Sequence, residues 1–239
     1  MYQTAETKQK YTEIDERAIT PGTNGMSEKS FLAVERWNPS TALIDPKNET
    51  NPTREGAEIC PQSFSYRGWL RPRALANDGQ ADDKKSEQFN QALYVRVIFT
   101  YTSTVNQSQR MPNVALDPNN DNFFLGPNGL PVGQDLGYED IYKPLNWKVT
   151  GKPLMDKVIF IPNQYGMNNT KLIKFNHRFS KNEKLSFLNN PATVDSANSA
   201  YPDKILSMFI FARYADDDTH IQYENLEAVG TGIFKFKDF

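Results

Sequence analysis

The sequence predicts an all-β fold, most simply a single large β-sandwich. Blocks with β-strand patterning recur between turn-rich stretches in the second half of the chain, and very little of the chain has helical periodicity. The last block alternates apolar and charged side chains up to the final residue, which indicates a strand inside a sheet. Because all-β folds often use about 200 to 250 residues as one unit, we expect residues 1–239 to form one domain.

The first half of the chain contains three expected strands. Residues 26–37 fit either a helix or a short strand, and the apolar run at 31–34 followed by charged residues favours a strand. The segment 38–58 carries prolines and a glycine among polar residues, so we expect a long connection there. Residues 63–70 and 93–104 have clear β patterning. Alternate residues of the latter strand form an apolar face expected in the core: Leu93, Val95, Val97, Phe99 and Tyr101.

Four further strands are expected in the second half, at residues 158–161, 171–180, 205–214 and 232–239. A long segment rich in Asn, Pro, Gly and Asp precedes them and has a single strand candidate, the run Phe123, Phe124 and Leu125. Loops of this length are uncommon in compact domains unless they have a function, so we expect this one to decorate or join surfaces.

The strand at 205–214 is apolar on both faces. One face holds Ile205, Ser207, Phe209, Phe211 and Arg213, and the other holds Leu206, Met208, Ile210, Ala212 and Tyr214. A strand of a two-layer sandwich meets the core on one side only, so loops of the same chain or a neighbouring subunit must cover the second side. The candidate subunit-interface residues are Leu206, Met208, Phe209, Phe211 and Tyr214.

Composition excludes several functional classes. The formal charge of −2 creates no global field that would attract nucleic acid or an anionic membrane, so any such contact must be local. No signal peptide or membrane-spanning run is apparent, and we expect a soluble intracellular product without membrane partners. The single cysteine, Cys60, has no partner for an intrachain disulfide.

Catalytic and metal sites have little support, and we expect no enzyme activity and no cofactor. The chain has only His177 and His220, and neither has the spacing of a metal-ligand motif. A hydrolase using Cys60 with His177 is a third alternative, although Cys60 lies in no catalytic signature. The weak metal candidates are the acidic residues Asp216, Asp217 and Asp218, for which the interpretation as charges that block a sheet edge is favoured.

Six segments together resemble a known family. They are residues 66–73, 94–101, 156–161, 171–175, 204–218 and 234–239. In order and character they resemble the capsid proteins of circular single-stranded DNA viruses, the circovirus-like and geminivirus-like group. The resemblance covers roughly residues 60–239. It implies a single-domain eight-stranded viral jelly roll with long inter-strand loops, which self-assembles into a small icosahedral shell of about sixty copies around a circular DNA genome.

The resemblance also implies a virion location, assembly inside the host cell and a host receptor, but the chain departs from the family in one respect. Residues 1–20 lack the arginine-rich arm that such coat proteins use to neutralise packaged DNA. Contact with genomic single-stranded DNA is therefore expected from local basic stripes that face the lumen and do not read sequence. The candidates are Arg67, Arg71, Arg73, Lys174, Arg178, Lys181, Lys235 and Lys237, with Trp69 available for stacking.

A carbohydrate-binding, lectin-like sandwich is the main alternative. Its sugar site would use aromatic residues of the Asn-rich loops, namely Phe123, Phe124, Trp147 and Tyr165. A coat subunit is expected to form large particles, whereas a lectin is expected to remain a small oligomer that responds to glycans.

Overall fold

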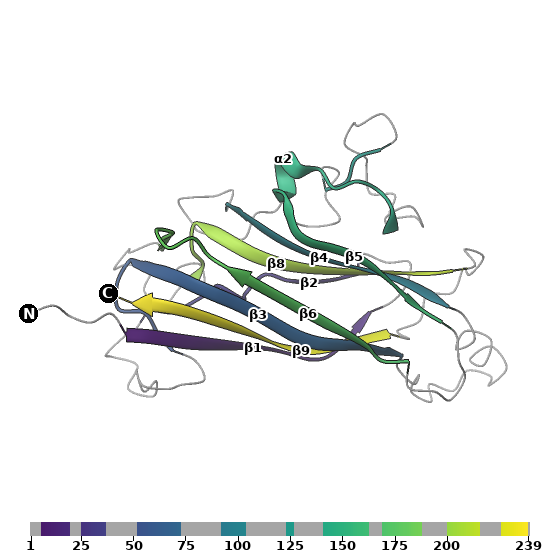
Figure 1. The fold of residues 1–239 in the computed structure, drawn as a ribbon, viewed down its shortest axis with the longest axis horizontal. Helices are drawn as coiled ribbons and strands as arrows, with labels where there is room; N and C mark the ends of the chain where they lie inside the picture. The colour runs from purple at the N-terminus through teal and green to yellow at the C-terminus, as the bar shows by residue number, and fades with distance from the viewer. Residues whose placement is uncertain are drawn as a thin grey trace, which may run out of the picture.

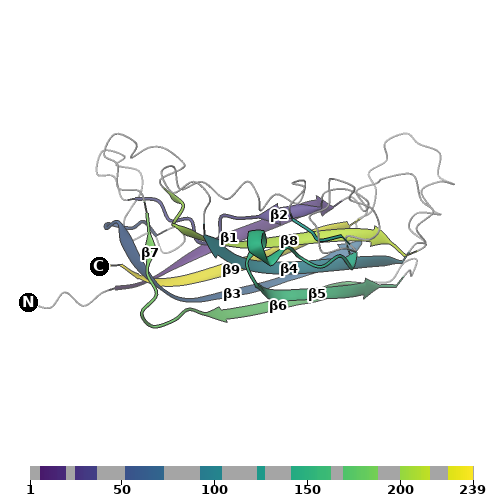
Figure 2. The same cartoon turned by 90° about the horizontal axis from the view of Figure 1, so that it is seen from above.

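The computed structural model describes residues 6–19, 25–36, 52–72, 92–103, 123–126, 141–162, 169–187, 200–215 and 226–238, which form two facing antiparallel sheets (Figure 1). Figure 2 shows the same two layers from above. One sheet contains β1 (Glu6–Ile19), β9 (Leu226–Asp238), β3 (Glu58–Pro72) and β6 (Lys171–Arg178), with the short β7 (Leu185–Ser186) beside β3. The other contains β2 (Met26–Glu28), β8 (Lys204–Tyr214), β4 (Leu93–Ser103) and β5 (Pro153–Ile161).

The strand pairings nest like those of one long hairpin. β4 pairs with β5, β3 with β6, β2 with β8 and β1 with β9, all antiparallel. Rolling this hairpin brings β9 against β3 and β8 against β4, which gives the sheet orders β1-β9-β3-β6 and β2-β8-β4-β5. Eight main strands wound in this way are a jelly roll, so the predicted all-β fold class is confirmed.

The strands expected at 63–70, 93–104, 158–161, 171–180, 205–214 and 232–239 all correspond to observed strands, several of them longer than expected. The candidate at 123–125 forms only an isolated bridge between Phe124 and Leu145. The short helix α2 (Trp147–Thr150) begins after Asn146, whose side chain accepts a hydrogen bond from the Lys148 amide. No helix in the described ranges combines the length and hydrophobicity needed to cross a bilayer.

The strand β1 was not predicted from the sequence. It pairs with β9 from Glu6 opposite Asp238 to Ile19 opposite Leu226, with an irregularity between Ile14 and Arg17. Its outward positions are polar apart from one tyrosine, and several of its inward positions are lysine or threonine, so it has little apolar alternation. The sequence analysis noted of residues 1–20 only that they lack an arginine-rich arm. Most of these residues belong to a strand of the sheet.

The strand expected over 26–37 is wrong beyond Glu28, where β2 ends. The Glu28 carboxylate accepts a hydrogen bond from the Ser30 amide at 2.8 Å, and the Ala33 amide donates to the Ser30 carbonyl at 3.0 Å. The resulting turn inserts Phe31 and Leu32 into the core, where both are fully buried. The apolar run is thus explained by a buried turn and not by a strand.

Aromatic rings fill the core between the sheets. Phe99 of β4 stacks on Phe175 of β6 with ring centroids 4.2 Å apart, and Phe31 lies 4.9 Å from Phe64 of β3. Tyr66 lies against Phe99 at 5.6 Å. The inward face expected for β4 is confirmed, because its apolar residues from position 93 to position 99 belong to this buried cluster and Tyr101 packs against it.

A second apolar cluster covers the other face of β8. Phe209 and Phe211 pack under Phe123 and Phe124, and Phe209 lies 4.9 Å from Phe123. The sequence left open whether loops of the same chain or a neighbouring subunit cover this face of β8. Phe123 and Phe124 of the same chain cover it. This corrects the interface candidates, because a side chain buried within one subunit presents no surface to a neighbour. All five are 5% exposed or less: Leu206, Met208, Phe209, Phe211 and Tyr214.

Two inward lysines of β1 form hydrogen bonds to neighbouring segments of the chain. The ammonium group of Lys8 donates to the Asp238 carboxylate at 2.9 Å and to the Thr53 carbonyl at 3.0 Å. Lys10 donates to the carbonyl oxygens of Ser30 and Ala33. Burial lowers the pKa of Lys10 to about 8, although neighbouring carboxylates oppose this shift.

Replacing Lys10 with methionine is expected to change how stability depends on pH. Between pH 8 and the ordinary lysine pKa of 10.5, the unfolded chain holds a proton on Lys10 that the folded chain lacks. The unmodified protein should therefore gain stability relative to Lys10→Met as pH rises through this window, by up to about 1 kcal/mol per pH unit. Urea unfolding of both proteins between pH 7.5 and 9.5 measures the difference, and parallel profiles would contradict it.

Candidate nucleic-acid interface

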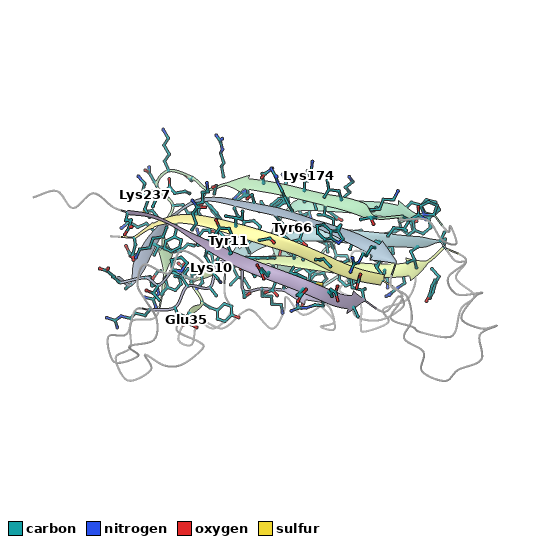
Figure 3. All side chains as sticks on the ribbon, turned by 90° about the horizontal axis from the view of Figure 1, so that it is seen from below. Lys10, Tyr11, Glu35, Tyr66, Lys174 and Lys237 are labelled. Atoms are coloured by element: carbon teal, nitrogen blue, oxygen red, sulfur yellow. The ribbon has the colours of Figure 1, made fainter. Side chains whose placement is uncertain are left out.

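The outward face of the β1-β9-β3-β6 sheet gathers basic side chains from three strands. In β9 and β3 the phenylalanines and Tyr66 point into the core, so the alternate residues point outward. Figure 3 views this sheet from below, with Lys174 on β6 and Lys237 towards the end of β9. We call this surface the basic face, and its cations are Arg67, Lys174, Arg178, Lys235 and Lys237.

Strand register places these cations close together. Arg67 lies directly opposite Lys174, and Ser63 lies opposite both Lys235 and Arg178. Neighbouring strands of a sheet are about 4.8 Å apart, and alternate residues of one strand are about 6.8 Å apart. None of the five has an ion pair with another described residue, and all but the half-buried Lys237 are exposed. Five of the eight sequence-predicted basic candidates thus meet on one surface.

The remaining three candidates differ from these five. Arg71 is engaged within the chain, because its guanidinium donates to the carboxylates of Glu227 and, at 3.0 Å, Glu16. Lys181 is exposed in the turn that follows β6. Arg73 lies outside the described residues.

Exposed apolar side chains lie among the cations. Tyr11 is 40% exposed and Trp69 39% exposed, and Leu172 lies directly opposite Trp69. Tyr11 was missed because β1 was not predicted. The outward position of Leu172 could have been read from the sequence, because strand alternation places it on the same face as Lys174 and opposite to Ile173. Cations interspersed with aromatic rings suit single-stranded nucleic acid, because the cations neutralise phosphates while the rings stack on bases.

The fold does not allow the Cys60 and His177 pair. Cys60 lies opposite Lys237 on the outward face, whereas His177 lies opposite Phe64, which points into the core. The two side chains therefore project from opposite sides of the sheet. Burial lowers the pKa of His177, whose ring packs edge-on against Phe179 at 4.7 Å. The interpretation of His177 as a packed residue fits this position better than a catalytic one.

No metal site occurs within the described ranges, where no three His, Cys, Asp or Glu side chains cluster. The weak candidates Asp216, Asp217 and Asp218 lie outside those ranges.

Two of the four residues named for a sugar site are unavailable. Phe123 and Phe124 are 0% and 4% exposed and pack on the chain's own β8. Trp147 is 59% exposed on α2, and Tyr165 lies outside the described residues. An aromatic platform built on the two phenylalanines is therefore wrong.

The nested strand order identifies the class of fold as a two-sheet jelly roll. No protein-family model and no curated protein matches the chain. Among solved structures, the chain is similar to the VP2 subviral particle of infectious bursal disease virus, at 8% identity and a TM-score of 0.32 over 98% of this chain and 34% of that one. It is also similar to the Mud crab tombus-like virus structure, at 10% identity and a TM-score of 0.33 over 100% of this chain and 92% of that one. Both likenesses are remote, so the functional argument rests on this chain's own residues.

Proposed function

We propose that this chain is a viral coat subunit that self-assembles into a small icosahedral shell of about sixty copies around a circular single-stranded DNA genome. The observation that carries this proposal is the basic face, where cations without an ion pair to any other described residue share one side of a jelly-roll sheet with exposed aromatic rings. The chain acts by association and not by turnover. Its place is the virion, after assembly inside the host cell.

The basic face gives the proposed packaging a physical basis within the sandwich itself. Arg67, Lys174 and Lys235 project from three neighbouring strands of a rigid sheet, and Trp69 lies beside them. Cations on a rigid scaffold bind phosphates without reading bases, and each phosphate neutralised releases a counterion. With this face towards the lumen, the sheet itself contacts the genome.

A triple substitution of Lys174, Arg178 and Lys235 by alanine tests the basic face. We expect at least a tenfold loss of affinity for a single-stranded oligonucleotide, with the slope of log affinity against log salt reduced by about 2, since each phosphate contact contributes about 0.7. Fluorescence anisotropy at several salt concentrations measures both quantities. The matched control replaces the exposed Lys148, Lys152 and Lys157, which changes net charge equally away from this face. Equal losses in the two variants would contradict the assignment.

Self-assembly is tested by negative-stain electron microscopy and sedimentation of the purified chain. Uniform spherical particles are the expected result. A homogeneous 27.3 kDa species at every salt concentration and pH would overturn the coat-subunit proposal. A glycan array would then test the carbohydrate alternative, for which the exposed Trp147 beside a pocket is the remaining support.

A further inference from the structure

The large exposed apolar side chains of the described residues fall into two groups. Tyr11, Trp69 and Leu172 belong to the basic face. The other five lie on or near β5 and α2, on the side of the molecule away from the basic face, where α2 stands outside the sandwich (Figure 1). We call this second group the β5 surface, and it consists of Tyr142, Trp147, Leu154, Val158 and Phe160.

The β5 surface is produced by alternation on an edge strand. β5 pairs with β4 and ends the β2-β8-β4-β5 sheet. Met155 and Ile159 pack against the core, so the alternate residues Leu154, Val158 and Phe160 point outward with exposed fractions of 37% to 47%. The outer face of a sheet is normally polar, whereas these three outward side chains are apolar.

Aromatic contacts connect β5 to the segment before α2. Tyr94 of β4 lies 5.1 Å from the Phe160 ring and 6.2 Å from the Tyr142 ring. Tyr94 therefore connects the exposed rings of Phe160 and Tyr142, which lie on β5 and on the segment before α2.

A pocket of about 520 Å³ opens beside this patch, lined by Trp147, Leu125, Pro144 and Pro153 among others. Its polar part is the ion pair of Arg96 and Asp156, with two hydrogen bonds of 2.8 and 2.7 Å. A further Arg96 nitrogen donates to a backbone carbonyl at 2.7 Å. The pocket is therefore mainly apolar, and the charges of Arg96 and Asp156 are matched within the chain, whereas Lys148 adds a further charge to the lining.

The size of the patch fits one side of a specific protein interface. If a large side chain has roughly 200 Å² of surface, the five expose on the order of 500 Å² of apolar area. A standard interface buries about 800 Å² on each partner, of which roughly 60% is apolar. The exposed Lys148, next to Trp147 on α2, places a charge at its border, as the polar rim of an interface does.

We propose that a second copy of this chain covers the β5 surface and inserts an apolar side chain into the adjoining pocket. This inference rests on the proposed function, since a shell subunit must bury part of its surface against copies of itself. It also replaces the buried candidates of β8 with residues that a neighbour can reach. Trp147, the most exposed of the five, is the expected centre of the contact, because tryptophan is enriched among the few residues that carry most of the binding energy of an interface.

The substitution Trp147→Glu tests the inference, with Trp69→Glu on the basic face as its matched control. We expect Trp147→Glu to remain a 27.3 kDa species under conditions in which the unmodified chain forms particles. Trp69→Glu should still form particles and should bind oligonucleotides more weakly. Sedimentation velocity and electron microscopy measure assembly, and circular dichroism confirms that both variants are folded.

The possible outcomes separate this inference from the proposed function. Particles formed by Trp147→Glu as readily as by the unmodified chain would overturn the β5 contact alone. An unmodified chain that stays monomeric throughout would overturn both proposals. If Trp147→Glu fails to fold, Val158→Lys, at a side chain 40% exposed on the same surface, decides by the same measurements.

Discussion

The substitution Phe209→Asp is expected to prevent folding. Phe209 is fully buried, and its ring contacts Phe123 edge-on at 4.9 Å beneath the loops that cover β8. An aspartate at this position would leave a carboxylate without a partner in an apolar cluster, which costs several kcal/mol, and would also remove the contacts of the ring. Because the total stability of a domain is only about 5 to 15 kcal/mol, the chain should lose its native state.

Circular dichroism and thermal unfolding measure this effect, and Phe160→Asp is the matched control. Phe160 is 47% exposed on β5, so the same change there should leave the fold intact. The pair separates loss of folding from loss of assembly. A Phe209→Asp protein with a native melting temperature would contradict the assignment of this residue to a buried cluster.

The substitution Phe99→Ala is expected to destabilise the protein by about 3 to 5 kcal/mol. Phe99 is fully buried and contacts four aromatic rings, three of them on strands of the opposite sheet, including Phe175 stacked at 4.2 Å. Removing its ring leaves a cavity that the surrounding rings cannot close completely. In a protein of this size, the melting temperature should fall by about 10 °C.

Differential scanning calorimetry of Phe99→Ala beside Leu172→Ala checks this prediction. Leu172 is 55% exposed, so its truncation should change stability by less than about 0.5 kcal/mol. Equal effects of the two substitutions would show that Phe99 is not central to the core.

Strand alternation made much of the sandwich predictable. The strands around Phe99 and Phe209 have strong β patterns, and both are observed. β1 could not be found in the same way, because inward positions such as Lys8 and Lys10 satisfy their charged groups with an acid and with backbone carbonyls. Its pairing with β9 depends on partners that are remote in sequence.

The candidate site was predictable as residues but not as a surface. Lys174 and Lys235 were recognised as basic positions on strands, yet only the order β9-β3-β6 brings them to one face. The second apolar face of β8 was also recognised, but the sequence did not show that Phe123 and Phe124 cover it. Contacts between remote segments decide both questions, and no local pattern encodes them.

The nested pairing of the strands has a consequence for biosynthesis. β1 leaves the ribosome before the other strands of the sandwich, but its partner β9 lies more than two hundred residues later, at Leu226–Asp238. Until β9 emerges, one edge of β1 and one edge of β3 have no partner, and such edges are prone to pair with other nascent chains. The sheet can close only after translation of β9, so contacts of high sequence separation should make folding slow.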